Sequence, residues 1–148
     1  YASEDGRCLI IDGTLNSFAI GCGVTEYTIP DSVTTIGYGA FAYCSSLTSV
    51  TIGDSVTTIG EDAFNSCSSL TSVTIPDSVT TIGYMAFAYC SSLTSVYCKA
   101  VTPPAGGSSM FYGKASGRII YVPMESVEVY KSATGWSDYA DAIVGYEF

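Results

Sequence analysis

The chain of 148 residues carries a formal net charge of −9, with 13% charged and 47% apolar residues. The charged share is about half of the ~25% usual in soluble domains. Residues 28–96 contain no lysine or arginine, so nucleic acids and anionic membranes, which are held by basic side chains, are disfavoured partners. The chain has no histidine, which excludes His-based catalytic triads, general bases and zinc sites.

The first segment predicts a β-hairpin. Two apolar runs, 8–11 and 14–20, flank Asp12-Gly13, a dipeptide typical of two-residue hairpin turns. We expect the hairpin to cover the open edge of the structure that follows. Cys8 and Cys22 could form a disulfide across this hairpin, and the residues alone leave that alternative open.

Three copies of one 23-residue unit follow, beginning at Thr28, Thr51 and Thr74, and 18 of the 23 positions are identical in all three. A fixed period in the twenties indicates a solenoid, in which each copy forms one coil stacked on the last. One copy cannot stand alone, because ordering its backbone costs more free energy than its own buried side chains return. Both ends of the stack therefore need caps.

Each coil is expected to begin with a strand. Alternation directs Val73 and Ile75 inward and leaves Thr74 facing outward. A turn follows at Pro76, whose counterpart in the second copy is Gly53, a change that should loosen one turn without altering the fold.

The second half of the coil is expected to bend and return. Gly83 allows a sharp bend. The segment 86–90 reads as one helical or 3₁₀ turn with Phe87 and Cys90 on the same side. Beyond residue 96 the strand pattern recurs in degenerate form. Five strands are expected, near residues 24–29, 47–52, 70–75, 93–98 and 117–122.

The C-terminal segment predicts a helical cap. Ser126 can cap a short helix that Gly135 can end, with Val127 and Tyr130 facing inward. Helical spacing then predicts a closing turn through Trp136, Tyr139 and Ile143.

The repeated unit L-T-S-V-T-I-P-D-S-V-T-T-I-G-x-x-A-F-x-x-C-S-S resembles the BspA-type leucine-rich repeat of bacterial surface proteins. The family's cysteine matches Cys44, Cys67 and Cys90, and its Ala-Phe pair matches Phe41, Phe64 and Phe87. The run from Pro103 to Trp136 is similar to a terminal module joined to such repeats in anaerobic gut bacteria. The resemblance implies secreted or surface-attached proteins with roles in adhesion to host proteins or other cells.

We therefore predict an α/β fold, a right-handed leucine-rich-repeat solenoid of about five coils. It has a parallel sheet on one face, an N-terminal β-hairpin cap and a short C-terminal helical cap. A single domain, 1–148, is expected: hairpin cap and degenerate coil (1–27), three repeats (28–96), and degenerate coil with C-terminal cap (97–148).

Two sets of side chains recur with the period and could bind metals. The first is Cys44, Cys67 and Cys90. Stacking places these thiols ~4.8 Å apart but pointing the same way, which favours buried hydrophobes over a disulfide or metal site. The second is Asp31, Asp54 and Asp77. A turn role is favoured over calcium, which needs about six to eight oxygens. We expect no metal site and no cofactor.

Catalysis is disfavoured as well, because Glu61 and Asp62 are adjacent and could not face each other across a cleft as a glycosidase pair. The candidate binding residues are the outward side chains of the strands: Thr48, Ser49, Thr51, Thr71, Ser72, Thr74, Thr94, Ser95 and Tyr97. A second patch comprises the variable positions Tyr38, Gly39, Tyr43, Glu61, Asp62, Asn65, Ser66, Tyr84, Met85 and Tyr89.

The predicted function is a non-enzymatic binding or adhesion module, an extracellular or cell-surface monomer that recognises host or neighbouring-cell proteins or glycans. No apolar run reaches the ~20 residues of a membrane span, and the start at Tyr1 indicates a processed product. Alternatives are a structural spacer with a merely solvated strand face, and a threonine array that recognises ice or a crystalline polymer. The array is disfavoured because the outward positions do not read as a strict T-x-T lattice.

Overall fold

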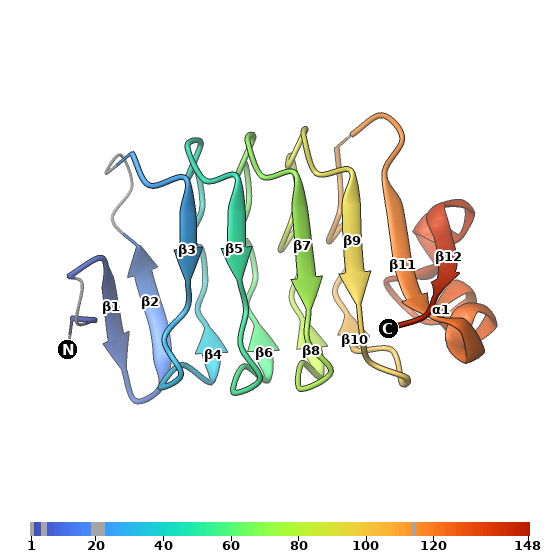
Figure 1. The fold of residues 1–148 in the computed structure, drawn as a ribbon, viewed down its shortest axis with the longest axis horizontal. Helices are drawn as coiled ribbons and strands as arrows, with labels where there is room; N and C mark the ends of the chain where they lie inside the picture. Colours follow the sequence, from blue (N-terminus) through green and yellow to red (C-terminus); the bar gives the residue numbers. More distant parts are fainter. Residues whose placement is uncertain (1, 4–5, 19–22, 114) are drawn as a thin grey trace.

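A computed structural model describes residues 2–3, 6–18, 23–113 and 115–148, and shows a stack of coils (Figure 1). The strands of the described residues form two six-stranded sheets, and successive strands alternate between them from the second strand to the eleventh. The front sheet runs in the order β12 (Ile143–Tyr146), β11 (Ile119–Pro123), β9 (Ser95–Cys98), β7 (Ser72–Ile75), β5 (Ser49–Thr51), β3 (Glu26–Thr28). The back sheet runs in the order β1 (Cys8–Ile11), β2 (Thr14–Phe18), β4 (Thr35–Ile36), β6 (Thr58–Ile59), β8 (Thr81–Ile82), β10 (Ala105–Gly106).

Both sheets are parallel except for the β1–β2 hairpin. The five strands predicted from the sequence are confirmed as β3, β5, β7, β9 and β11, most of them a few residues shorter than expected. Apart from the hairpin strands β1 and β2, the sequence did not predict the strands of the back sheet, which are only two residues long, or β12. Ile143 lies in β12 and not on the predicted helical turn, which ends at Ala142.

The core lies between the two sheets and is continuous from coil to coil. Val73 and Ile75 are buried while Thr74 is exposed, as predicted. Phenylalanine rings stack on one another along the solenoid. The Phe41 and Phe64 centroids are 4.9 Å apart with an interplanar angle of 6°, and those of Phe64 and Phe87 are 5.1 Å apart at 1°. Each coil thus buries its ring against both neighbours.

The predicted helical turn around Ala86-Phe87 is wrong. The segment is a run of turns in which two residues per coil adopt left-handed backbone, for example Met85 (φ 54°) and Tyr89 (φ 58°). Their N–H groups point at the next coil: Met85 donates to Ser108 O at 3.2 Å and Tyr89 to Tyr112 O at 2.7 Å. These bonds between coils alternate with local turn bonds, in which Ala86 N donates to Gly83 O at 3.3 Å and Ala88 N to Met85 O at 3.1 Å.

Gly83 has a different role from the predicted bend. Its φ does not lie in the left-handed region. A Cβ atom here would lie 2.5 Å from the backbone nitrogen of Glu61 and 2.7 Å from the carbonyl carbon of Gly60. The equivalent glycines of the other coils, Gly37, Gly60 and Gly107, approach the preceding backbone in the same way. The glycine is therefore required because two coils touch there.

The N-terminal hairpin is confirmed. Its turn residues Asp12 (φ 49°) and Gly13 (φ 76°) are both left-handed, as a two-residue hairpin turn requires. The hairpin extends the back sheet, because β2 pairs with β4. Phe18 covers the end of the core, with its ring 4.9 Å from Phe41. Cys22 lies outside the described residues, so the alternative of a disulfide between Cys8 and Cys22 stays untested.

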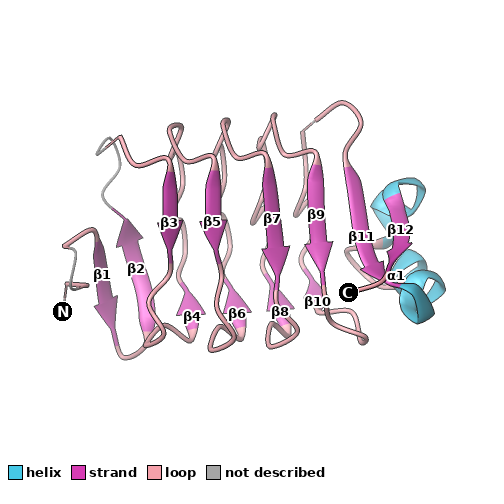
Figure 2. Cartoon of the chain, in the orientation of Figure 1, coloured by secondary structure: helices cyan, strands magenta, loops and turns pink. Residues whose placement is uncertain are grey.

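The C-terminal cap combines η1 (Met124–Ser126), α1 (Val127–Ser132) and η2 (Ser137–Ala142), shown at one end of the stack in Figure 2. Ser126 lies at the start of α1 but makes no capping bond, because its hydroxyl donates to Val101 O at 2.7 Å. The helix ends at Ser132, before Gly135. Among the described residues, none of the helices has the length and apolar character needed to cross a bilayer.

The cap holds the last coil by hydrogen bonds from buried aromatic side chains. Tyr130 donates its hydroxyl to Ala100 O at 2.6 Å, and Trp136 donates Nε1 to Pro104 O at 2.8 Å. Burial raises the pKa of Tyr130, and the neighbouring Cys98 adds to that shift. Tyr130 therefore remains a donor at any physiological pH. Val127 is only partly buried but packs against the core.

The Arg118 side chain donates hydrogen bonds to three backbone carbonyl groups. Its Nε donates to Leu93 O at 2.7 Å, Nη1 to Phe111 O at 2.7 Å and Nη2 to Cys90 O at 3.0 Å. The guanidinium carbon lies 5.7 Å from the Phe111 ring centroid. Burial lowers the pKa of Arg118 from its ordinary value. One side chain therefore satisfies acceptors from three chain segments.

Gly53 offers a stabilising substitution. Its φ is not left-handed, the nearest atom to an added Cβ is Asp31 Oδ1 at 3.8 Å, and proline occupies the same place at Pro30 and Pro76. Gly53→Pro should raise the free energy of unfolding by about 0.4–1 kcal/mol, because proline restricts the unfolded chain. Urea unfolding followed by circular dichroism measures the change. A lower midpoint than that of the unaltered chain would show that the second coil bends differently from its neighbours.

Candidate functional site

The outer face of the front sheet carries two rows of side chains in register. Cross-strand pairing aligns one row as Thr28, Thr51, Thr74, Tyr97 and Tyr121. In the other row Glu26 pairs with Ser49, and Ser72 pairs with Ser95 and then Ile119. Parallel strands stack equivalent positions at ~4.8 Å, so the 23-residue period becomes straight lines of hydroxyl groups.

Six of the nine predicted residues lie in the strands of this face, whereas Thr48, Thr71 and Thr94 each come one residue before a strand. Thr51, Thr71, Ser72, Thr74 and Thr94 are exposed, whereas the remaining four, Thr48, Ser49, Ser95 and Tyr97, are half-buried.

Two of the predicted threonines bond within the solenoid. The Thr48 hydroxyl donates to Thr25 O at 2.9 Å, and that of Thr71 donates to Thr48 O at 3.4 Å. These side chains tie one coil to the last at the entry to each strand. Their hydroxyls are therefore partly occupied, and the strand residues beyond them are better candidates for contacts with a partner.

A groove lies between β5 and β7. Its volume is about 290 Å³, and its lining includes Ser49, Thr51, Ser72 and Thr74 from the predicted set. Strands β5 and β7 pair in register only at Thr51 and Thr74, whereas β7 and β9 pair at four positions. Asp54 and Lys99 also line this groove, so it offers one acidic and one basic group beside its hydroxyls.

An aromatic cluster adjoins the groove and was only partly foreseen. Tyr97 and Tyr121 stack with centroids 4.7 Å apart at 10°. Tyr146 meets both rings edge-on, at 5.6 and 5.4 Å, and Phe148 lies 4.9 Å from Tyr146. The sequence does contain the signal for Tyr121, which precedes Pro123 by two residues as Thr74 precedes Pro76. Tyr146 was missed because β12 was missed.

A second pocket, of about 380 Å³, lies at the C-terminal side of the cluster. Its lining includes Met124, Tyr146 and Phe148 together with Lys99. Because Lys99 lines both hollows, the groove and this pocket are neighbours along one face.

The variable patch is exposed chiefly through its tyrosines. Tyr38 is 73% exposed and Tyr43 67%. In the second coil Asn65 donates Nδ2 to Asp62 Oδ1 at 2.8 Å, and Ser66 donates its hydroxyl to Asn65 Oδ1 at 2.7 Å. Three of the five substitutions of this coil, Asp62, Asn65 and Ser66, therefore form one local network.

The cysteines bond to the backbone of the preceding coil. Cys67 donates Sγ–H to Phe41 O, and Cys90 to Phe64 O, each at 3.1 Å. The hydrogen bond with Cys90 and burial raise the pKa of Cys67. A protonated buried thiol fits a structural role.

The aspartates of the second set, Asp31, Asp54 and Asp77, lie exposed in turns. Within the described ranges, no three His, Cys, Asp or Glu side chains come together where they could hold a metal ion.

Comparison with known proteins places these features in a family. A family model described as the BspA-type leucine-rich repeat region matches residues 15–134 in six copies. A comparison with curated proteins finds no match.

The first of two similar solved structures supports the fold. A leucine-rich repeat protein from Eubacterium ventriosum ATCC 27560 is 26% identical with a TM-score of 0.64, over 82% of this chain and 34% of that one. A leucine-rich cell surface protein from Faecalibacterium prausnitzii A2-165 is 26% identical with a TM-score of 0.49, over 70% of this chain and 37% of that one. The chain thus spans about a third of the length of either crystallised protein. Because the family model covers well over half of the chain, the protein belongs to the BspA-type leucine-rich repeat proteins.

Proposed function

We propose that the chain is a non-enzymatic binding module of a bacterial cell-surface or secreted protein, and that the outer face of the front sheet contacts its partner. The partner is a protein or glycan of a host or neighbouring cell. The groove between β5 and β7 carries this proposal, because its lining includes four of the nine predicted side chains together with Asp54 and Lys99. Family membership supports the surface location.

The charge distribution supports the same face. Residues 28–96 hold no basic side chain, so attraction to nucleic acid or anionic lipid does not compete with other contacts there. From β5 to β9 the outward rows consist of serine, threonine and tyrosine, whose hydroxyls can both donate and accept hydrogen bonds.

The test is a pull-down against host extracellular proteins and immobilised glycans. The variant Thr51→Lys, Thr74→Lys places two long cations on the groove and should abolish capture that the unaltered chain shows. The matched control is Thr58→Lys, Thr81→Lys, in which the same change is made at a register pair of the back sheet. Loss of binding in both variants, or in neither, would contradict a site on the front sheet.

A structural spacer is the second candidate. The hydroxyls of Thr48 and Thr71 favour it, because they bond to the preceding coil and so need no partner to explain them. A spacer would tolerate the Thr51→Lys, Thr74→Lys change without any loss of attachment or capture by the whole protein.

A further inference from the structure

We infer that the front face binds a neutral glycan chain, with one sugar ring stacked on the free face of Tyr97 and its hydroxyls bonded in the groove between β5 and β7. This inference rests on the proposed binding role of that face. It names the class of ligand and the residue that would contribute most to affinity.

The Tyr97 side chain is larger than the threonine and serine side chains beside it on the front sheet. Its ring stacks on Tyr121 at 4.7 Å and 10°, so Tyr121 covers one face. The register places Thr74 on the opposite side, and a threonine side chain is too short to cover an aromatic ring. The second face of Tyr97 is therefore directed over the row of small hydroxyl side chains. Aromatic rings bind apolar C–H faces in this way, with the hydroxyl ends left for polar contacts.

Neighbouring aromatic rings hold the Tyr97 ring in place before any ligand binds. Tyr146 meets Tyr97 at 73° and Tyr121 at 71°, so it contacts both members of the stack. A ring fixed by two neighbours loses little conformational freedom on binding, which favours affinity.

The groove between β5 and β7, beside Tyr97, matches a polyhydroxylated ligand in size and polarity. Its volume of about 290 Å³ lies just below the ~300–1,000 Å³ range of small-molecule sites, so it accommodates one or two rings of a longer chain. Serine and threonine hydroxyls, the Asp54 carboxylate and the Lys99 ammonium supply both acceptors and donors.

The same features disfavour charged chains and peptides. The groove has one acidic and one basic group, so an anionic or cationic chain gains no net attraction. Strands β5, β7 and β9 are each paired on both sides, so they offer no free backbone edge to an extended peptide.

Isothermal titration with cellohexaose, xylohexaose and mannohexaose tests the inference. We expect binding of at least one of these probes, and a fall in affinity of about tenfold for Tyr97→Thr, which installs the residue that the repeat has at Thr51 and Thr74. The control is Tyr112→Thr, which removes a tyrosine that is 53% exposed in the turns, away from the front sheet, and should leave affinity unchanged. Circular dichroism confirms that both variants fold.

The outcomes separate this inference from the proposed function. If none of the three probes binds while the Thr51→Lys, Thr74→Lys variant loses a protein partner, the ligand is a protein and the glycan inference is wrong, although the front face still binds. If a probe binds the unaltered chain and Tyr97→Thr equally well, the stacking role is wrong. If neither a probe nor a partner depends on the front face, both proposals fail.

Discussion

Replacing Gly83 with alanine is expected to destabilise the chain by about 3 kcal/mol, a large part of the ~5–15 kcal/mol that holds a typical domain folded. The added methyl group would lie 2.5 Å from the backbone nitrogen of Glu61 and 2.8 Å from its Cα. Backbone atoms cannot rotate aside as a side-chain end can, so the two coils must separate. That separation stretches the bond from Gly83 N to Ile59 O, which is 2.8 Å long.

Urea denaturation measures this effect, with Gly53→Ala as the control. Gly53 also lies between regular segments, yet its nearest contact for a methyl group is 3.8 Å away, so we expect a change of less than about 0.5 kcal/mol. Equal unfolding midpoints for Gly83→Ala and Gly53→Ala would contradict the close contact between coils.

Arg118→Met should be the next most damaging change, with a loss of about 2–4 kcal/mol. Methionine keeps an apolar stem beside Phe111 but donates no hydrogen bond, so the carbonyl oxygens of Leu93, Phe111 and Cys90 lose their shared donor. Hydrogen bonds to a charged group contribute about 1.5–3 kcal/mol each. The expected loss is smaller than three such bonds because Arg118 is only half-buried and water can replace part of the contact.

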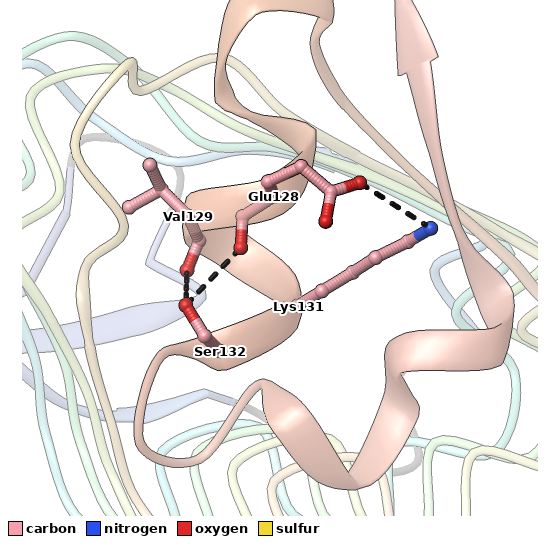
Figure 3. Close-up of polar contacts among 4 residues, drawn as sticks. All are labelled: Glu128, Val129, Lys131 and Ser132. Carbon is pink, nitrogen blue, oxygen red and sulfur yellow. Dashed lines mark hydrogen bonds and ion pairs between the residues drawn. The ribbon is translucent and has the colours of Figure 1, made fainter.

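Lys131→Met removes the same charge from the C-terminal cap, beyond β11, and serves as the control. Figure 3 shows Lys131 on the surface of α1, where its Nζ lies 4.0 Å from Glu128 Oε1. Ser132, on the same helix, bonds only to the local carbonyls of Glu128 and Val129. Exposed ion pairs contribute little, so the unfolding free energy should change by less than about 1 kcal/mol. A loss as large as that of Arg118→Met would mean that net charge, and not the three carbonyl bonds, stabilises the cap.

Strands β3, β5, β7, β9 and β11 of the front sheet could be predicted because burial imposes a period of two on them. The exposed Thr74 between buried Val73 and Ile75 follows directly from that alternation. The hairpin was predictable for a similar local reason, since Asp12-Gly13 suits a turn with two left-handed residues.

Other features depend on contacts between different coils, which no local sequence pattern predicts. The left-handed turns include Met85 and Tyr89, residues that rarely adopt positive φ, so their identity gave no hint of the conformation. Arg118 bonds to carbonyls 25 and 28 residues earlier, where spacing along the chain is uninformative.

The site was predictable only where it follows the repeat. Its hydroxyl row obeys the 23-residue period, and Tyr97 and Tyr121 share that register. The third ring of the cluster, Tyr146, comes from β12, which lies outside the repeats and follows a segment whose spacing resembles a helix.

Because the contacts between coils repeat, the length of the solenoid can change while the residues that bind a partner stay the same. Thr57 bonds Thr34 as Thr80 bonds Thr57, and Phe64 stacks on Phe41 as Phe87 stacks on Phe64. Each coil therefore contacts the next coil through the same kinds of residue through which it contacts the preceding coil. Recombination within the gene can add or remove a whole 23-residue repeat. Each such change would move the aromatic cluster by ~4.8 Å along the stack and leave its rings unchanged.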